Sequence, residues 1–118
     1  MSETRVVHVN DKVPGAVYIG RANGRKRLPA SPFANPYRLV AGSAADRAAV
    51  VQLYRDGLLD YRRHLLRSLP DLRGKPLACW CRHDGEARTP DNVCHGDVLV
   101  ELLESHTDDE LRAMGDAA

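Results

Sequence analysis

The sequence predicts an α/β fold: a small single domain whose sheet has three or more strands, at least partly parallel, with two main helices and a short C-terminal helix. Two short strand-like segments near the start, an apolar periodicity of three and four residues in the middle, and a strand–loop–helix unit after it support this prediction. A chain of 118 residues fits one domain with one modest core. We therefore expect a single α/β domain over residues 1–118, with its core at about 5–104 and a short C-terminal helix and tail at 105–118.

Three segments are expected to be strands. Residues 5–9 alternate, residues 17–19 are apolar and are stopped by Gly20, and residues 76–81 follow a turn. The segment between Gly20 and Gly42 repeats Gly, Asn, Pro and Ser, which indicates a long loop. Since a sheet of three strands barely stands alone, a homodimer is one expectation.

Two main helices are expected. Ser43 is expected to cap the first, in which Leu58 and Tyr61 fall on the apolar face and which Pro70 is expected to end. The second is expected to follow the last cysteine and to bury an aliphatic face. A capping pattern at residues 107–110 predicts the short last helix.

Composition is that of an ordinary globular protein. Hydrophobic residues make up 43% of the chain and charged residues 28%, and the net charge is +1. No apolar run approaches the roughly 20 residues of a membrane span, and the first residues do not resemble a secretion signal. We therefore expect a cytoplasmic protein with no membrane partner, whose three cysteines are thiols or metal ligands rather than disulfides.

Cations gather in one segment of the chain. Residues 20–45 contain five basic residues and no acidic one. Most of them are arginines, which suit bidentate contacts with phosphate. The segment therefore predicts a phosphate-bearing partner, either a nucleotide or a nucleic acid, with a solvated loop as the alternative.

Four candidate metal ligands gather around the third strand. Cys79 and Cys81 are two residues apart, so they project from one face of a strand, and Trp80 is expected to face the core on the other. Cys94 and His95 stand where the next helix begins, which in a βα unit lies at the carboxyl edge of the sheet. Three thiolates and one imidazole are a common zinc set, so these four residues predict a zinc site.

Other interpretations of the cysteines stay open. The three could hold an iron–sulfur cluster with one open iron, with His95 as the fourth ligand or beside it. Cys94 could instead be a reactive thiolate, because a helix N-terminus lowers the pKa of a thiol. Alternatively, Cys79 and Cys81 are small buried residues of a core strand.

Four further residues are candidates for binding a ligand at this edge. Arg21 follows the second strand and would clamp a phosphate or carboxylate, with an exposed loop arginine as the alternative. Asn35 would present an amide to a base or sugar, although Asn before Pro is also a common turn signal. Tyr37 would offer an aromatic face, and Arg38 another cation.

The first turn of the second helix supplies two more candidates. Gly96 would let an anionic ligand approach the free amides of the helix N-terminus. Asp97 would act as a general base or would orient His95, which would carry a proton. The alternative for Asp97, which we favour, is that it stabilises the helix N-terminus.

Four strings of residues occur in an order that resembles a known family. They are residues 17–21 (Val-Tyr-Ile-Gly-Arg), 31–37 (Ser-Pro-Phe-Ala-Asn-Pro-Tyr), 74–81 (Gly-Lys-Pro-Leu-Ala-Cys-Trp-Cys) and 94–99 (Cys-His-Gly-Asp-Val-Leu). Together they resemble the domain-of-unknown-function family 4326, found in bacteria and their phages. The resemblance implies a compact α/β domain and brings no established activity.

The chain departs from that family in the spacer between its cysteine pairs. Residues 82–93 make this spacer longer than in the family members. The longer loop is expected to bring additional side chains near the cysteines as substitute ligands. These side chains are His83, Asp84, Glu86 and Asp91.

The favoured function is a small metal- or cluster-binding protein with a nucleotide-like anionic ligand beside the cysteines. If it is an enzyme, we expect hydrolysis or group transfer on a nucleotide or a modified base. One alternative is a non-catalytic nucleic-acid-binding or adaptor module with a structural zinc, whose binding would fall steeply with salt. Another is a thiol-based redox protein.

Overall fold

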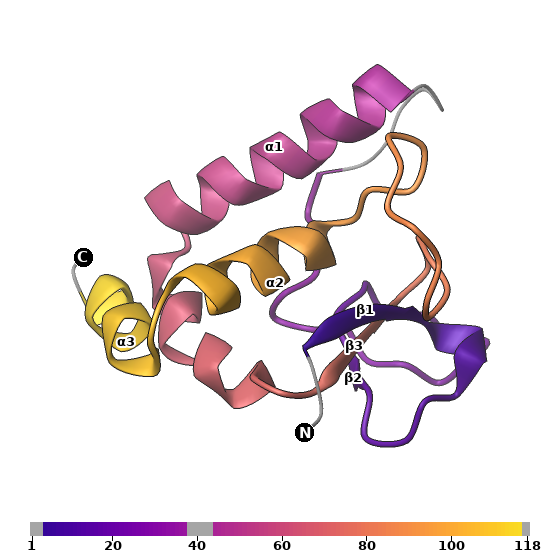
Figure 1. Cartoon of the computed structure of the whole chain (residues 1–118), viewed down its shortest axis with the longest axis horizontal. Coiled ribbons are helices and arrows are strands. Elements are labelled where there is room, and N and C mark those ends of the chain that lie inside the picture. Colours follow the sequence, from indigo (N-terminus) through magenta and orange to yellow (C-terminus); the bar gives the residue numbers. More distant parts are fainter. Residues whose placement is uncertain (1–3, 38–43, 117–118) are drawn as a thin grey trace.

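A parallel sheet forms one side of the molecule. The computed structural model describes residues 4–37 and 44–116. Within them, the sheet has three strands in the order β1–β3–β2, and β3 runs parallel to both neighbours, which confirms the predicted α/β class (Figure 1). The strands are β1 (Arg5–His8), β2 (Val17–Tyr18) and β3 (Pro76–Cys79).

Strand β3 is the central strand and is buried along its whole length. In its register His8 lies opposite Cys79, and Tyr18 lies opposite Ala78. Because all three strands are parallel, their carboxyl ends meet at one edge of the sheet. This is the edge at which α/β proteins commonly bind ligands.

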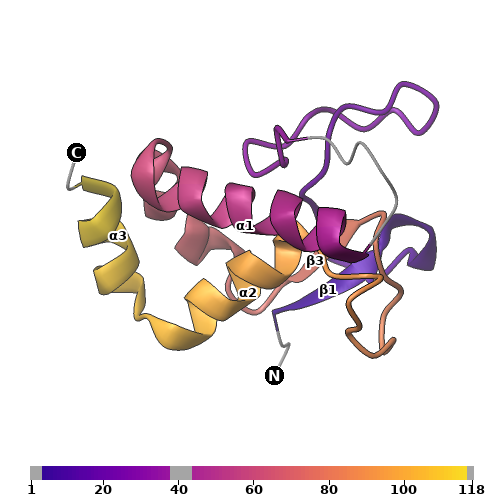
Figure 2. The same ribbon diagram turned by 90° about the horizontal axis from the view of Figure 1, so that it is seen from above.

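The helices are α1 (Ala44–Asp60), α2 (His95–Ser105) and α3 (Asp108–Asp116), so the predicted two main helices and short C-terminal helix are confirmed. Helix α2 packs against β1 on one side and against α1 on the other (Figures 1 and 2). Among the described residues, none of these helices has the length and apolarity needed to cross a membrane. Ser43, the expected cap of the first helix, lies outside the described residues.

Helix α1 is shorter than predicted. It ends at Asp60, whereas the periodicity predicted a helix that Pro70 would end. The carbonyl oxygen of Gly57 accepts hydrogen bonds from the amides of both Tyr61, at 2.8 Å, and Arg62, at 2.9 Å, and this closes the helix. Tyr61, predicted on the apolar face, is 83% exposed, so that assignment is wrong.

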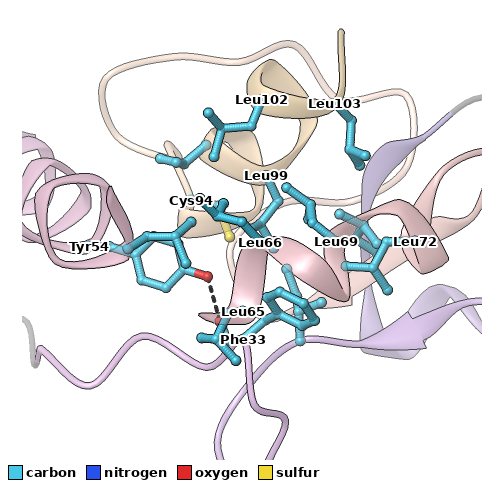
Figure 3. Close-up of a cluster of buried hydrophobic side chains, with 14 of the residues drawn as sticks. Phe33, Tyr54, Leu65, Leu66, Leu69, Leu72, Cys94, Leu99, Leu102 and Leu103 are labelled. Atoms are coloured by element: carbon cyan, nitrogen blue, oxygen red, sulfur yellow. Dashed lines mark hydrogen bonds between the residues drawn. The ribbon is translucent and has the colours of Figure 1, made fainter. Parts of the chain in front are cut away.

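Two 3₁₀ helices, η2 (Arg63–Arg67) and η3 (Leu69–Leu72), follow α1 and complete the core. Pro70 lies in the first turn of η3, where its fixed φ and missing amide hydrogen are tolerated. Helix η2 contacts α3, and η3 contacts α2. The core beneath α1 and α2 includes Tyr54, Leu58, Leu66, Leu69, Leu99, Leu102 and Leu103, several of which Figure 3 shows.

Strand β3 ends two residues earlier than predicted, and Trp80 therefore leaves the sheet. The side chain of Trp80 is 40% exposed, so the prediction of a core tryptophan is wrong. The neighbouring strands stop at His8 and Tyr18, which pair with Cys79 and Ala78, and no paired strand continues beside Trp80 in the described sheet. The indole N–H instead donates to the hydroxyl of Tyr18 at 2.9 Å.

Candidate functional site

The three cysteines meet at the carboxyl edge of the sheet. The sulfur atoms of Cys79, Cys81 and Cys94 all lie within 4.8 Å of one another, and those of Cys79 and Cys94 are 3.1 Å apart. Cys79 is the last residue of β3, and Cys94 immediately precedes α2. Cys79 and Cys94 are buried, and Cys81 is partly exposed. This group could hold a metal ion.

The three sulfurs lie close enough together to contact a single ion. A tetrahedral zinc ion with Zn–S bonds of about 2.3 Å keeps its sulfurs about 3.8 Å apart. All three sulfurs here lie within 4.8 Å of one another, and those of Cys79 and Cys94, at 3.1 Å, would move apart to reach this separation. Thiolates that bind separate irons of a cluster point outward from it and therefore stand farther apart.

A capping box fixes the position of Cys94. The Cys94 backbone is extended (φ −135°, ψ 152°), and its sulfur accepts a hydrogen bond from the amide of Gly96 at 3.4 Å. The carboxylate of Asp97 accepts the amide N–H of Cys94 at 2.9 Å. Cys94 thus takes the N-cap position that Ser, Thr, Asp or Asn usually occupies. The start of α2 thereby holds the sulfur beside Cys79.

Asp97 is buried and paired with Arg82. The guanidinium of Arg82 donates to both carboxylate oxygens, at 2.5 and 3.0 Å, and also to the carbonyl oxygen of Asn92 at 3.3 Å. These contacts and the hydrogen bond from the Cys94 amide occupy the carboxylate of Asp97, which therefore faces Arg82 and Cys94 rather than His95. Sequence reasoning missed Arg82, whose only signal was its place directly after Cys81.

Gly96 gives α2 room to approach the sheet. A Cβ atom at this position would lie 2.8 Å from the side chain of Ile19 and 3.0 Å from that of Val6. The amide of Gly96 is directed at the Cys94 sulfur, and Gly96 does not line the adjoining pocket. These contacts show that Gly96 packs α2 against the sheet, and its expected contact with a ligand stays a prediction.

His95 presents a lone pair toward the cysteines. Its Nε2 lies 2.8 Å from the carbonyl oxygen of Ile19, which can only accept, so Nε2 carries the hydrogen and Nδ1 is free of one. Nδ1 lies 3.7 Å from the sulfur of Cys94, although His95 is outside the group whose ligand atoms are all within 4.8 Å. Burial lowers the pKa of His95, and the ring of Tyr54 packs edge-on at 5.0 Å.

The thiols share their charge unequally. Hydrogen bonds from Cys79 and Cys94 lower the pKa of Cys81. Hydrogen bonds with Cys79 and Cys81, together with burial, raise the pKa of Cys94. The hydrogen bond with Cys81 is the main cause that raises the pKa of Cys79. The direction of these shifts favours Cys81 as the most acidic thiol of the group, whereas the sequence raised Cys94 as a candidate reactive thiolate.

A pocket of about 320 Å³ adjoins the cysteines. All three cysteines and His95 line it, together with residues from the 20–37 loop and from α1. Its charged lining residues are Arg21 and Arg47, and no acidic residue is among the described residues that line it. The arrangement therefore suits a negatively charged ligand.

The predicted ligand residues build the wall of this pocket. Arg21 donates to the carbonyl oxygens of Asn35, at 3.0 Å, and of Tyr37, at 2.7 Å. The side-chain oxygen of Asn35 accepts the amide N–H of Tyr37 at 2.9 Å, which is the turn geometry expected of Asn before Pro. The structure thus brings Arg21, Asn35 and Tyr37 together with the cysteines. Arg38 lies outside the described residues.

The four side chains of the 82–93 loop that were expected as substitute ligands point elsewhere. His83 bonds to Asp11 at 2.6 Å, and Asp84 forms an ion pair with Arg5 at 2.9 Å. The carboxylate of Glu86 accepts the amide of His83. Neither these residues nor Asp91 line the pocket, so the expected substitute ligands lie apart from the three sulfurs.

Comparison with known proteins gives a family without an assigned activity. Over 88 residues the chain is 31% identical to "Uncharacterized protein R718" of Acanthamoeba polyphaga mimivirus. That alignment covers 73% of this chain and 65% of the viral protein, so the chain spans about 65% of its relative's length. No solved structure matches the chain. Residues 4–105 match the domain of unknown function DUF4326, and the chain therefore belongs to that family.

Proposed function

We propose that this chain binds one zinc ion through Cys79, Cys81 and Cys94, and that the ion opens onto a pocket for a nucleotide-like anion. One observation carries the proposal: three sulfurs within 4.8 Å of one another line the wall of a pocket of about 320 Å³. Zinc prefers sulfur ligands in tetrahedral geometry, and a set of three protein ligands leaves a fourth position for a water or a substrate.

The lining of the pocket supports an anion that carries a ring. Arg21 and Arg47 supply positive charge, and no acidic residue among the described lining residues opposes it. Tyr37 and Trp80 line the same pocket and are 36% and 40% exposed, so both retain surface for stacking. A phosphate joined to a nucleobase combines these two chemistries.

Hydrolysis or group transfer is the chemistry that we propose for a bound nucleotide. His95 would be the proton carrier, because its neutral ring keeps a lone pair on Nδ1 next to the cysteines. Asp97 would be a positioning residue that holds Cys94 through the backbone, since its oxygens bond to Arg82 and to the amide of Cys94.

Metal analysis of the protein purified anaerobically under reducing conditions tests the site. We expect about one zinc per chain in a colourless protein, and loss of zinc in Cys79→Ser, Cys81→Ser and Cys94→Ser. Ala78→Ser is the matched control, because it adds a hydroxyl on the same buried strand and removes no sulfur. Iron with inorganic sulfide would contradict the single-ion assignment, and protein with neither metal would contradict a metal site.

A second candidate, a thiol redox protein, is favoured by the 3.1 Å between the sulfurs of Cys79 and Cys94. In that case an added oxidant would join these two thiols in a disulfide and would leave Cys81 free. Titration of free thiols before and after zinc loading separates the candidates, because zinc bound to all three sulfurs would protect them from the oxidant.

A further inference from the structure

Three consecutive cations stand at the tip of a hairpin. Asn23 and Leu28 pair in an antiparallel bridge with hydrogen bonds of 2.9 and 3.0 Å, and residues 24–27 form the turn between them. Arg25, Lys26 and Arg27 are all exposed, and none of them forms a salt bridge with another described residue. We call these three residues the basic fingertip. In Figure 2 the loop that carries it projects away from the helices and the sheet.

The hairpin that carries the basic fingertip starts at the rim of the pocket, but the three cations themselves lie outside the pocket. Asn23, at the base of the hairpin, lines the pocket, as do the two residues before it, whereas Arg25, Lys26 and Arg27 do not. A single nucleotide that fills the pocket would therefore leave these cations unused. A chain of nucleotides that runs from the pocket across its rim would place its next phosphates on them.

Aromatic rings border the same pocket. The exposed large hydrophobic side chains of the described chain include Trp80 and Tyr37, and both line the pocket. The row of rings continues beyond Trp80, because His8 packs edge-on against it at 5.7 Å and His83 stacks on His8 at 4.2 Å. The basic segment of residues 20–45 itself has few aromatic residues. The fold therefore assembles, from distant segments, the combination of cations and stacking rings that single-strand binding uses.

We infer that the pocket receives one nucleotide of a single-stranded nucleic acid, with its base against Trp80 and the phosphates next to it on the basic fingertip. This inference rests on the proposed function for the pocket and names the class of ligand. A duplex fits less well, because its bases are paired and stacked and cannot enter a pocket without being flipped out. Stacking on aromatic rings and phosphate contacts read no particular base, so we expect weak sequence preference.

Fluorescence anisotropy of the zinc-loaded full chain tests the inference. The probe is a short labelled single strand of mixed sequence, as DNA and as RNA, with a duplex of the same sequence for comparison. The test variant is Arg25→Ala/Lys26→Ala, and the control is Lys75→Ala/Arg112→Ala, which removes the same charge from exposed positions that do not line the pocket. We expect the test variant to bind on the order of tenfold more weakly in low salt, and the slope of log K against log[salt] to fall by about 1.4, at 0.7 per lost phosphate contact.

The intrinsic fluorescence of the protein gives a second readout. Trp80 is the only tryptophan in the chain, so stacking of a base on it should quench the emission as the single strand is added. The control variant should show the same quenching as the unmodified protein at saturation.

The outcomes separate this inference from the proposed function. The inference is wrong if the test variant and the control variant lose affinity for the single strand equally. It is also wrong if the duplex binds as tightly as the single strand. If thymidine monophosphate saturates the pocket while the single strand fails to bind, the ligand is a free nucleotide and only the proposed function survives. If zinc is absent but the basic fingertip still governs binding of the single strand, the metal proposal fails and nucleic-acid binding stands.

Discussion

The guanidinium of Arg82 donates to both carboxylate oxygens of Asp97, and the same carboxylate accepts the amide N–H of Cys94. Both side chains of this ion pair are buried. The pair therefore connects the loop after β3 to the first turn of α2. Arg82 directly follows Cys81, and Asp97 lies three residues after Cys94. A buried pair of this kind is costly to break on one side, because the remaining charge has no partner and little water.

Asp97→Ala should destabilise the fold and loosen the site. We expect a loss of about 3–5 kcal/mol in the free energy of unfolding, since the Arg82 charge would stay buried without its partner. Zinc affinity should fall by about 10–100-fold, as it does when groups that orient metal ligands are removed. Urea denaturation and zinc competition with a chelator measure the two effects. Asp108→Ala, which breaks the half-exposed ion pair with Arg73, should cost at most about 1 kcal/mol and leave zinc affinity unchanged.

The meeting of Cys79 and Cys94 could be predicted from the sequence, because a strand followed by a helix places the strand end next to the helix start. The ion pair between Arg82 and Asp97 could not be predicted, because it depends on the path of the long loop between the two residues. The exposed position of Trp80 depends on where β1 and β2 end, and alternation along one strand does not show this. Local patterns thus predicted the strands, the start of each helix and the meeting of the cysteines, but they missed the end of α1. Contacts between distant segments set the lining of the pocket.

Zinc binding should release protons. Cys79 and Cys94 have raised pKa values beside the Cys81 thiolate, so both are protonated near neutral pH in the metal-free protein. Binding through three thiolates would then release about two protons, and zinc affinity would rise with pH. Calorimetric titration in buffers of different ionisation enthalpy counts these protons. No release, or the release of three, would contradict the unequal sharing of charge among the thiols.

Two glycine substitutions should have opposite outcomes. At Gly96 a Cβ would meet Ile19 at 2.8 Å and Val6 at 3.0 Å, so Gly96→Ala should destabilise the protein by about 1–3 kcal/mol despite the helix propensity of alanine. At Gly57 the nearest atom to a new Cβ is the hydroxyl of Tyr37 at 3.4 Å, which is ordinary contact. Gly57→Ala should therefore be neutral or should stabilise by up to about 1 kcal/mol. Thermal unfolding of the two variants checks the difference, and equal effects would contradict the close packing of α2 on the sheet.

The ion pair between His83 and Asp11 should make stability depend on pH. The hydrogen bond to Asp11, at 2.6 Å, raises the pKa of His83, and with two backbone amides it lowers the pKa of Asp11 to about 2. The His83 contribution is complete below the ordinary histidine pKa and is lost as pH rises through the raised one, whereas the Asp11 contribution is lost as pH falls from 3.8 toward 2. The pair should therefore stabilise the fold most between about pH 4 and 6. An NMR titration of the His83 ring should show its pKa falling toward the ordinary value in Asp11→Asn. An unchanged pKa in that variant would mean that Asp11 does not hold the imidazolium.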